Sequence, residues 1–461
     1  MRASKLLAWT LAWLGLAVGQ IADAQFTRVP GRPATYRAGF GALPSAAAPV
    51  VPLRVVTTQN RTFVGAENRA VTNAYVRWPI VIAANATDLV LSFNGWYQQG
   101  SGAGETSLAN GYTVVEAAIE NAGGTISTPV RFGGGRSITI NAGDNDIHSD
   151  AVLPAAFGPQ WAAGTQYWIK AKLQVPTTSG VLPYSDRAVS SVSGSQVAWY
   201  DPAATTVSSA DTPGAFTSTG TAPGSRANGP CPMVLGHPVV DGPSFIGVGD
   251  SIMAITADAG ANTSAVNGVG FFQRAMHDAG TATTNLRPSI NMARVGAAST
   301  HYTGANTRWQ AFAAYAKYAV TELGTNDIGT SSSTLPGVLE PDEAAIWSAL
   351  RAKGVQKIVR TKLIPRTSST DAWATVANQT PYPGFVTGGA AEQFNAWIDG
   401  KLADGTIDYV VAMSSTRDSA VPQKWPANGS ANSQTSDGTH PVAAYHELMA
   451  GELRPVVGAL P

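Results

Sequence analysis

The stretch Ser244-Phe245-Ile246-Gly247-Val248-Gly249-Asp250-Ser251 is a short apolar run that ends in a serine. A brief apolar run bounded by glycine and proline is typical of a buried strand. A serine hydroxyl is a weak nucleophile until a base accepts its proton. In open α/β sheets the reactive groups gather beyond the carboxyl ends of the strands. We therefore expect Ser251 to be a candidate nucleophile at such an edge.

Strand-like and helix-like segments alternate five times after residue 243. The expected strands are residues 244–248, 290–295, 318–323, 357–364 and 408–413, and the expected helices are residues 268–279, 307–315, 342–353, 390–403 and 440–453. This alternation predicts a parallel sheet that helices cover on both faces.

Two further loops at expected strand ends carry polar residues. The third strand leads into Gly324-Thr325-Asn326-Asp327, which places a side-chain amide there. The final loop reads Asp437-Gly438-Thr439-His440-Pro441. Each stretch alone is also good turn or helix-cap chemistry. Together, however, the order of nucleophile, amide and acid–imidazole pair predicts a Ser251–His440–Asp437 triad, in which Asp437 orients the imidazole.

These blocks resemble those of the SGNH hydrolases, also called the GDSL-type esterase and lipase family. Gly249-Asp250-Ser251-Ile252 matches the first block with isoleucine in place of leucine, and the other two loops match the third and fifth blocks. The resemblance covers residues 244–461. It implies a flavodoxin-like three-layer α/β/α sandwich with a five-stranded parallel sheet.

The resemblance also implies the roles of the residues. Ser251 would form an acyl-enzyme, His440 would act as base and then acid, and Asp437 would hold the imidazole. The oxyanion would be bound by the backbone N–H groups of Ser251 and Gly296 and by the Asn326 amide. The second block is little more than one glycine, so Gly304 remains a competitor of Gly296. Neither a metal nor an organic cofactor is expected.

The first half of the chain has a different pattern. Short, often alternating runs separated by Gly, Asn, Asp or Pro predict an N-terminal antiparallel β sandwich within residues 25–200. Residues 201–243 are dense in Ser, Thr, Gly and Pro, which predicts a linker or long connection before the catalytic domain at 244–461. Several aromatic residues lie in the β region, and they either stack on sugars or fill the core: Trp78, Trp96, Tyr97, Trp161, Trp168 and Trp199.

Residues 1–24 have the pattern of a cleavable signal peptide. Arg2 and Lys5 precede an apolar run over residues 6–18, and Ala22-Asp23-Ala24 supplies a small-x-small cleavage pattern. The run is shorter than the roughly 20 residues of a spanning helix. We expect a secreted or periplasmic protein with no membrane span after cleavage, and the lone Cys231 permits no internal disulfide.

The charge composition of the chain limits the kinds of partner that it can bind. Thirty basic residues balance thirty acidic ones without a basic cluster, so no nucleic-acid partner is expected. The partner should be a small-molecule or polysaccharide ester. The sequence favours an exported carbohydrate O-acetyl esterase; the alternatives are an esterase or lipase acting on lipid or polyester, and a catalytically inactive carbohydrate-binding protein.

Overall fold

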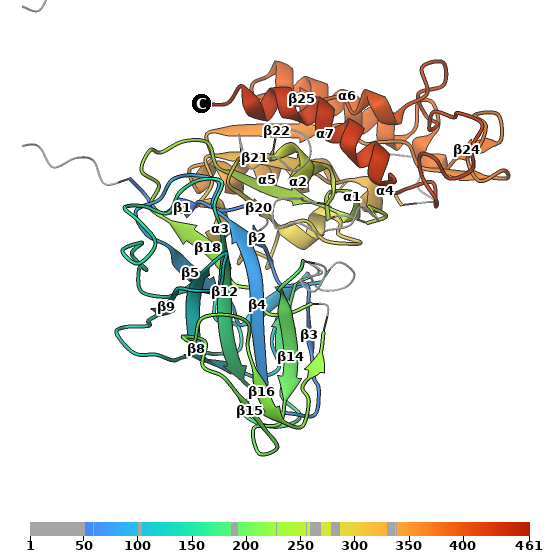
Figure 1. The fold of residues 1–461 in the computed structure, drawn as a ribbon. Helices are drawn as coiled ribbons and strands as arrows, with labels where there is room; N and C mark the ends of the chain where they lie inside the picture. Colours follow the sequence, from blue (N-terminus) through green and yellow to red (C-terminus); the bar gives the residue numbers. More distant parts are fainter. Residues whose placement is uncertain are drawn as a thin grey trace, which may run out of the picture. The chain divides into compact units, whose positions relative to one another are not determined.

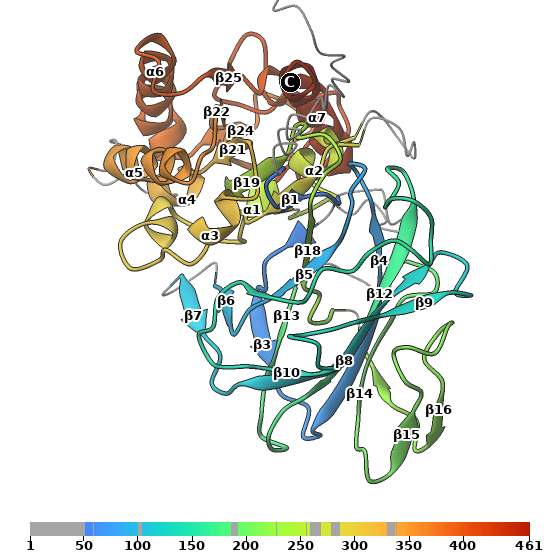
Figure 2. The ribbon, with the colours of Figure 1, turned by 90° about the vertical axis from the view of Figure 1, so that its left-hand side faces the viewer.

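A six-stranded parallel sheet forms the centre of the C-terminal half of the protein in the computed structural model (Figures 1 and 2). Its strands, in spatial order, are β2 (Asn60–Arg61), β20 (Ser289–Asn291), β19 (Phe245–Gly249), β21 (Tyr318–Glu322), β22 (Lys357–Thr361) and β25 (Tyr409–Val411). Each neighbouring pair is parallel. The five strands after residue 243 thus have the order 2-1-3-4-5 in the chain, which is the flavodoxin-like order.

The prediction of five strands is wrong by one, because the sheet recruits β2 from the first half of the chain. Asn60 and Arg61 pair in parallel with Ile290 and Asn291. The Arg61 guanidinium also donates a 2.6 Å hydrogen bond to the carbonyl of Ala254, close to Ser251. Two polar residues show no hydrophobic periodicity, so this edge strand had no sequence signal.

The structure describes residues 51–58, 60–99, 104–185, 192–226, 228–254, 256–258, 269–277, 286–329, 337 and 339–461. The expected signal peptide, residues 1–24, lies outside the described residues. Among the described residues, no helix has the length and apolarity that crossing a bilayer requires.

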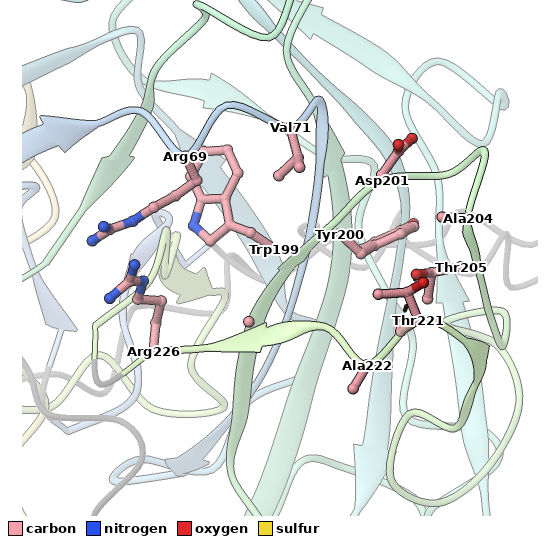
Figure 3. Close-up of a pocket in the computed structure, with 11 residues that line it drawn as sticks. Arg69, Val71, Trp199, Tyr200, Asp201, Ala204, Thr205, Thr221, Ala222 and Arg226 are labelled. Carbon is pink, nitrogen blue, oxygen red and sulfur yellow. Dashed lines mark hydrogen bonds between the residues drawn. The ribbon is translucent and has the colours of Figure 1, made fainter.

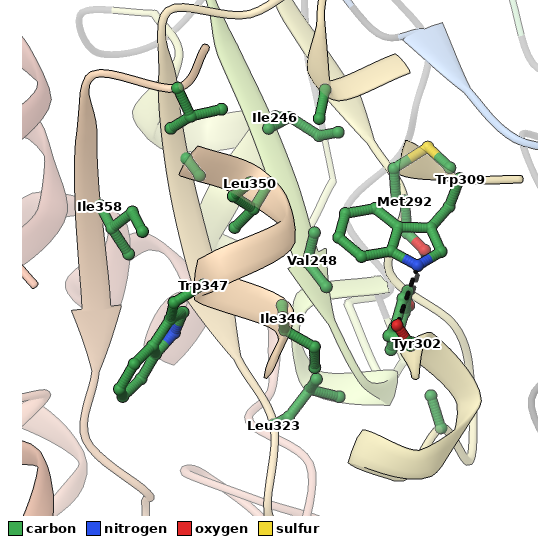
Figure 4. Packing of buried hydrophobic residues seen from close by; sticks show 14 of the residues in the cluster. Ile246, Val248, Met292, Tyr302, Trp309, Leu323, Ile346, Trp347, Leu350 and Ile358 are labelled. Carbon is green, nitrogen blue, oxygen red and sulfur yellow. Dashed lines mark hydrogen bonds between the residues drawn. The ribbon is translucent and has the colours of Figure 1, made fainter. Parts of the chain in front are cut away.

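Helices cover both faces of the parallel sheet, as Figure 2 shows. On one face pack α3 (Gln310–Ala313), α5 (Leu339–Ala352) and α6 (Ala390–Ala403), and on the other pack α1 (Ser251–Ala254), α2 (Phe271–Ala275) and α7 (Ala443–Gly458). Alternate strand residues enter the two cores: Ile246 and Ile358 point to the first (Figure 4), and Phe245 and Val359 point to the second. The three layers follow from strands that are apolar on both sides.

The first half of the described chain forms two antiparallel sheets that share an apolar core. The larger sheet has the order β10 (Ile138–Ile140), β8 (Tyr112–Asn121), β12 (Gln166–Gln174), β4 (Asn73–Val81), β14 (Gln196–Tyr200) and β17 (Gly224–Ser225), with β9 (Ser127–Val130) also paired to β8. The smaller sheet has the order β1 (Arg54–Val55), β18 (Met233–Gly236), β5 (Val90–Phe93) and β11 (Ile147–His148). Two small two-stranded antiparallel sheets pair β3 (Gly65–Glu67) with β13 (Leu182–Tyr184) and β6 (Trp96–Gln98) with β7 (Glu105–Ser107).

Residues 201–243 contain strands where the composition predicted a linker or long connection. β15 (Thr205–Val207) pairs with β16 (Ser218–Gly220), β17 extends the larger sheet, and β18 lies inside the smaller one. Met233 and Leu235 of β18 are fully buried. The sequence pattern did not indicate this apolar strand, because it is only four residues long and its flanks are rich in Ser and Gly. All described residues belong to one compact unit.

Some element boundaries differ from the prediction. The last helix begins at Ala443 rather than residue 440, because residues 437–442 form the turn that presents His440. The segment between β22 and α6 contains an unpredicted hairpin, β23 (Thr367–Ser369) and β24 (Gln379–Pro381). Short helical turns complete the fold: η2 (Ser299–Tyr302), α4 (Thr325–Ile328), η3 (Pro383–Phe385) and η4 (Ser414–Thr416).

His446 of α7 is fully buried and joins α7 to α2 and the end of α1. Its Nδ1 accepts a hydrogen bond from the N–H of Phe271, and its Nε2 lies 3.2 Å from the carbonyl oxygen of Thr256. The ring is therefore neutral, with the proton on Nε2. Burial lowers the pKa of His446 to about 4.

This buried imidazole predicts acid sensitivity. Below the ordinary histidine pKa of about 6.5 the unfolded chain binds a proton that the folded protein does not, so stability falls as the pH drops toward 4, by about 3 kcal/mol. His446→Gln, whose amide can both accept and donate, should lose about 2–3 kcal/mol less than wild type between pH 7 and pH 4. Urea unfolding at the two pH values measures this difference, and the other titrating groups cancel in the comparison. Equal losses in both proteins would contradict the prediction.

Candidate active site

The candidate site lies at the carboxyl ends of β19 and β21, where parallel pairing aligns the two strands. Gly249, the last residue of β19, is in register with Glu322, the last residue of β21. Ser251 and Asn326 then follow on the loops that leave the same sheet edge. A Cβ at Gly249 would lie 2.8 Å from the Glu322 carbonyl oxygen, so only glycine permits this close approach.

The sheet brings Ser251, His440 and Asp437 into one hydrogen-bonded chain. His440 Nε2 lies 2.8 Å from Ser251 Oγ, and His440 Nδ1 lies 2.6 Å from Asp437 Oδ2. With its proton on Nδ1, the ring leaves Nε2 as the acceptor of the serine proton. The Ser251 residue is only 4% exposed, so its hydroxyl faces the imidazole rather than bulk solvent.

Asp437 is held as an anion by three donors. Burial by itself would raise its pKa, but the hydrogen bonds from the His440 ring and from the backbone N–H groups of His440 and Thr439 lower it below the ordinary range. The Asp437 side chain is 49% exposed, against 17% for His440. A carboxylate that stays ionised fixes the tautomer and the orientation of the imidazole.

Backbone and amide donors of the kind that an oxyanion needs lie near the serine. Ser251 is the first residue of α1, where the N–H has no partner within the helix. The Asn326 amide donates one hydrogen bond, 2.9 Å long, to the carbonyl of Ala297. This contact orients the amide and connects it to the residue that follows Gly296.

Gly296 and Gly304 differ in their surroundings. Gly296 has a φ of +77° in the turn directly before Ala297, the residue that accepts from Asn326. Gly304 is exposed, beyond η2, and a Cβ there would contact nothing within 4 Å. The hydrogen bond of Asn326 thus reaches the residue that follows Gly296, and within the described residues no hydrogen bond joins Asn326 to Gly304.

Two buried carboxyl groups lie beneath the serine. The Asp250 N–H is 3.2 Å from Glu322 Oε2, and Asp250 Oδ1 accepts from the N–H of Ile252. Burial raises the pKa of Asp250 to about 6. Burial also raises the pKa of Glu322 well above its ordinary value, and repulsion from Asp250 adds to that rise. Burial therefore favours the neutral form of both carboxyl groups, and the hydrogen bond from Ile252 makes Asp250 part of the turn that carries Ser251.

Some supporting residues carried no sequence signal. The Tyr302 hydroxyl, fully buried, lies 2.9 Å from the Gly249 carbonyl oxygen and 2.7 Å from that of Met292, so it links the loops after β19 and β20. The Trp425 indole donates to the carbonyl of Gly438. Both side chains form hydrogen bonds with residues ten or more positions away in the chain. A short local motif does not indicate such contacts.

The six aromatic residues of the β region that the sequence singled out form no open platform for sugars. Trp78, Trp96, Trp161, Trp168 and Trp199 are all at most 5% exposed and fill the core, and only Tyr97 is partly exposed. A pocket of about 270 Å³ beside β14 has Arg69 and Arg226 flanking Trp199 (Figure 3). Because the Trp199 ring is buried, its face cannot stack on a ligand there.

The acidic residues on either side of β11 are hydrogen-bonded to groups of the protein. Asp150 accepts from the N–H groups of Gly133 and Gly134, and Asp146 accepts from Ser92 and lies within hydrogen-bond distance of the His148 ring. No cluster of three potential ligand residues with metal-binding geometry occurs within the described ranges.

Comparison with known proteins gives structural matches only. No protein-family model matches the sequence, and no curated protein matches it either. A GDSL-like lipase from Bacteroides thetaiotaomicron is similar at 14% identity over 47% of this chain and 87% of its own, with a TM-score of 0.32. An acetyl xylan esterase from Geobacillus stearothermophilus is similar at 15% identity over 48% and 96%, also with a TM-score of 0.32.

Another match extends over both halves of the protein. The carbohydrate esterase family 2 enzyme of Corynascus thermopiles (Myceliophthora fergusii), with its carbohydrate-binding domain, is similar at 13% identity over 88% of this chain and 99% of its own, with a TM-score of 0.33. The matches thus include GDSL-type enzymes, the class that the three sequence blocks resemble. At these identities the chemistry has to be argued from the site itself.

The geometry of the His440 loop predicts that Gly438 cannot be replaced. Its φ is +76°, and a Cβ would lie 1.8 Å from the Thr367 carbonyl oxygen and 2.8 Å from the Trp373 ring. Gly438→Ala should displace residues 437–440 and lower kcat on the order of 10²-fold, since misplacement by about 1 Å has such an effect. Steady-state kinetics with an activated acetyl ester measures the loss.

Gly429→Ala is the matched control. Gly429 lies in the same long loop with a φ of +87°, but a Cβ there would contact nothing within 4 Å. Its replacement should cost about 1–2 kcal/mol of stability through the left-handed backbone alone and leave kcat near that of wild type. Equal kinetic losses in the two variants would show that the Thr367 contact is irrelevant.

Proposed function

We propose that this protein is a serine carboxylic-ester hydrolase that works through an acyl-enzyme on Ser251. The observation that carries the proposal is the hydrogen-bonded chain from Asp437 through His440 to Ser251, with distances of 2.6 and 2.8 Å. This arrangement suits serine activation, because Asp437 faces Nδ1 of the imidazole and Ser251 Oγ faces Nε2, the nitrogen that accepts the serine proton.

The proposed reaction has two halves. His440 Nε2 accepts the Ser251 proton as Oγ attacks the ester carbonyl, and the resulting oxyanion binds to the N–H groups of Ser251 and Gly296 and to the Asn326 amide. His440 then protonates the leaving alcohol, which departs and leaves the acyl-enzyme. Water, deprotonated by the same imidazole, attacks the acyl group, releases the carboxylic acid and restores Ser251. Each oxyanion donor contributes roughly 3 kcal/mol to transition-state stabilisation.

For the substrate we propose short acyl esters, acetyl above all, on a saccharide. Polar side chains lie beside the triad: Asn326 on one loop, and Thr439 and Arg366 on the others. A long acyl chain would need a broad apolar surface to gain binding energy, whereas sugar hydroxyls suit polar neighbours. The signal-like N-terminus agrees with a substrate outside the cytoplasm, and export is part of this proposal.

The triad predicts strongly non-additive losses. Ser251→Ala and His440→Ala should each remove most turnover, by several orders of magnitude, and the double variant should lose little more, because the two residues act as a unit. Initial rates with an activated acetyl ester, together with unfolding curves to verify folding, measure this. Independent, additive losses would mean that the two side chains do not share one proton transfer.

The substrate proposal has its own test. Initial rates on acetylated oligosaccharides and on activated esters with acyl chains of two to twelve carbons should be highest for acetyl and fall steeply as the chain lengthens. Ser251→Ala provides the background rate. A maximum at long chains would replace the saccharide acetate with a lipid or polyester. Absence of turnover on every ester, with Ser251 inert to a serine-directed phosphonate, would favour a binding protein without catalysis.

A further inference from the structure

Arg366 lies on the segment that joins β22 to α6, immediately before the hairpin of β23 and β24. This segment leaves the sheet at the same edge as the loops that carry Ser251 and Asn326, because β22 is parallel to β21. The Arg366 side chain is partly buried, and its guanidinium carbon lies 5.9 Å from the centre of the Tyr382 ring. An arginine held in this way has a restricted set of rotamers.

The guanidinium of Arg366 connects two loops of the candidate site. Its Nε donates a 3.2 Å hydrogen bond to Thr439 Oγ1, and its Nη1 donates a 3.1 Å hydrogen bond to the Thr325 carbonyl oxygen. Thr439 directly precedes His440, and Thr325 directly precedes Asn326. One planar group therefore spans from the neighbour of the proposed base to the neighbour of the proposed oxyanion donor.

The two loops are otherwise anchored to different parts of the structure. The His440 loop is held through Gly438, whose carbonyl oxygen accepts from the N–H of Thr367 and from the Trp425 indole. The Asn326 loop is held through Ala297 and, by way of Asp327, through Ser299. Within the described residues, Arg366 bridges the two loops, because it donates one hydrogen bond to each of them.

We propose that Arg366 is a positioning residue that sets the separation between His440 and Asn326. The inference rests on the proposed function, because it assigns both residues to one transition state. In the transition state, His440 has to reach the serine and the leaving oxygen while Asn326 reaches the oxyanion. Both contacts form at the same time, so the distance between the two residues has to suit both. Arginine suits this role since its rigid fork donates in two fixed directions, which the single flexible ammonium of lysine cannot do.

The test compares wild type with Arg366→Ala and Arg366→Lys on an activated acetyl ester. For Arg366→Ala, kcat should fall on the order of 10²-fold, the effect of a displacement of about 1 Å, while KM stays within about threefold because the substrate contacts are intact. Arg366→Lys should recover only part of kcat. Guanidinium or methylguanidinium ion at non-denaturing concentration should raise the kcat of Arg366→Ala and leave that of wild type unchanged.

A second variant protects the test against loss of folding. Thr439→Val removes the acceptor of Nε while keeping the shape of the side chain, so it should lower kcat and should not add fully to Arg366→Ala. Arg417→Ala is the matched control, because Arg417 is also partly buried and donates to the carbonyl oxygens of Pro422 and Leu363, away from Thr439 and Thr325. It should reduce thermal stability, keep kcat near wild type and show no rescue by guanidinium.

Each outcome decides the proposal. A rise in KM without a fall in kcat would make Arg366 a substrate contact and overturn it. Equal kcat losses in Arg366→Ala and Arg417→Ala, or additivity of Arg366→Ala with Thr439→Val, would reduce Arg366 to a general structural role. A wild-type protein without Ser251-dependent turnover would remove the proposed function itself, and that result is recognisable before any Arg366 variant is measured.

Discussion

The parallel register of β19 between β20 and β21 is the constraint on which the site depends. Gly247 pairs with Asn291, and Gly249 pairs with Glu322, so the three strands end at nearly the same level. The loops that follow must leave from one edge, and their first polar residues meet there. Without this alignment, Ser251 and Asn326 would not lie at the same edge of the sheet.

The β region takes part in this arrangement rather than standing apart from it. Val55, Trp96 and Leu235 belong to the same buried cluster as Ile246 and the helices on that face of the parallel sheet. The Gln98 carbonyl of β6 accepts from the Arg294 guanidinium, two residues before Gly296. Since the two regions share a core and a sheet edge, removing one would expose apolar surface of the other.

The sequence predicted those features that depend on local pattern. Short apolar runs predicted β19, β21 and β22, and the Gly-Asp-Ser, Gly-Thr-Asn-Asp and Asp-x-x-His blocks pointed to the side chains that the fold brings together. It missed β2, because Asn60 and Arg61 have no periodicity, and it took residues 201–243 for a linker or long connection, because β18 is short. It also left open whether the tryptophans of the β region stack on sugars, since an alternating pattern does not show which face of a strand is buried.

By itself, then, the sequence determined the order of strands and helices after residue 243 and pointed to Ser251, His440 and Asp437 as candidates, because periodicity and short motifs are properties of neighbouring residues. Only the tertiary structure decided the sixth strand, the link between Asn326 and the Gly296 turn, and the place of Arg366. Arg366 contacts residues 41 and 73 positions away in the chain. Contacts of that separation exist only once the parallel strands have aligned their loops.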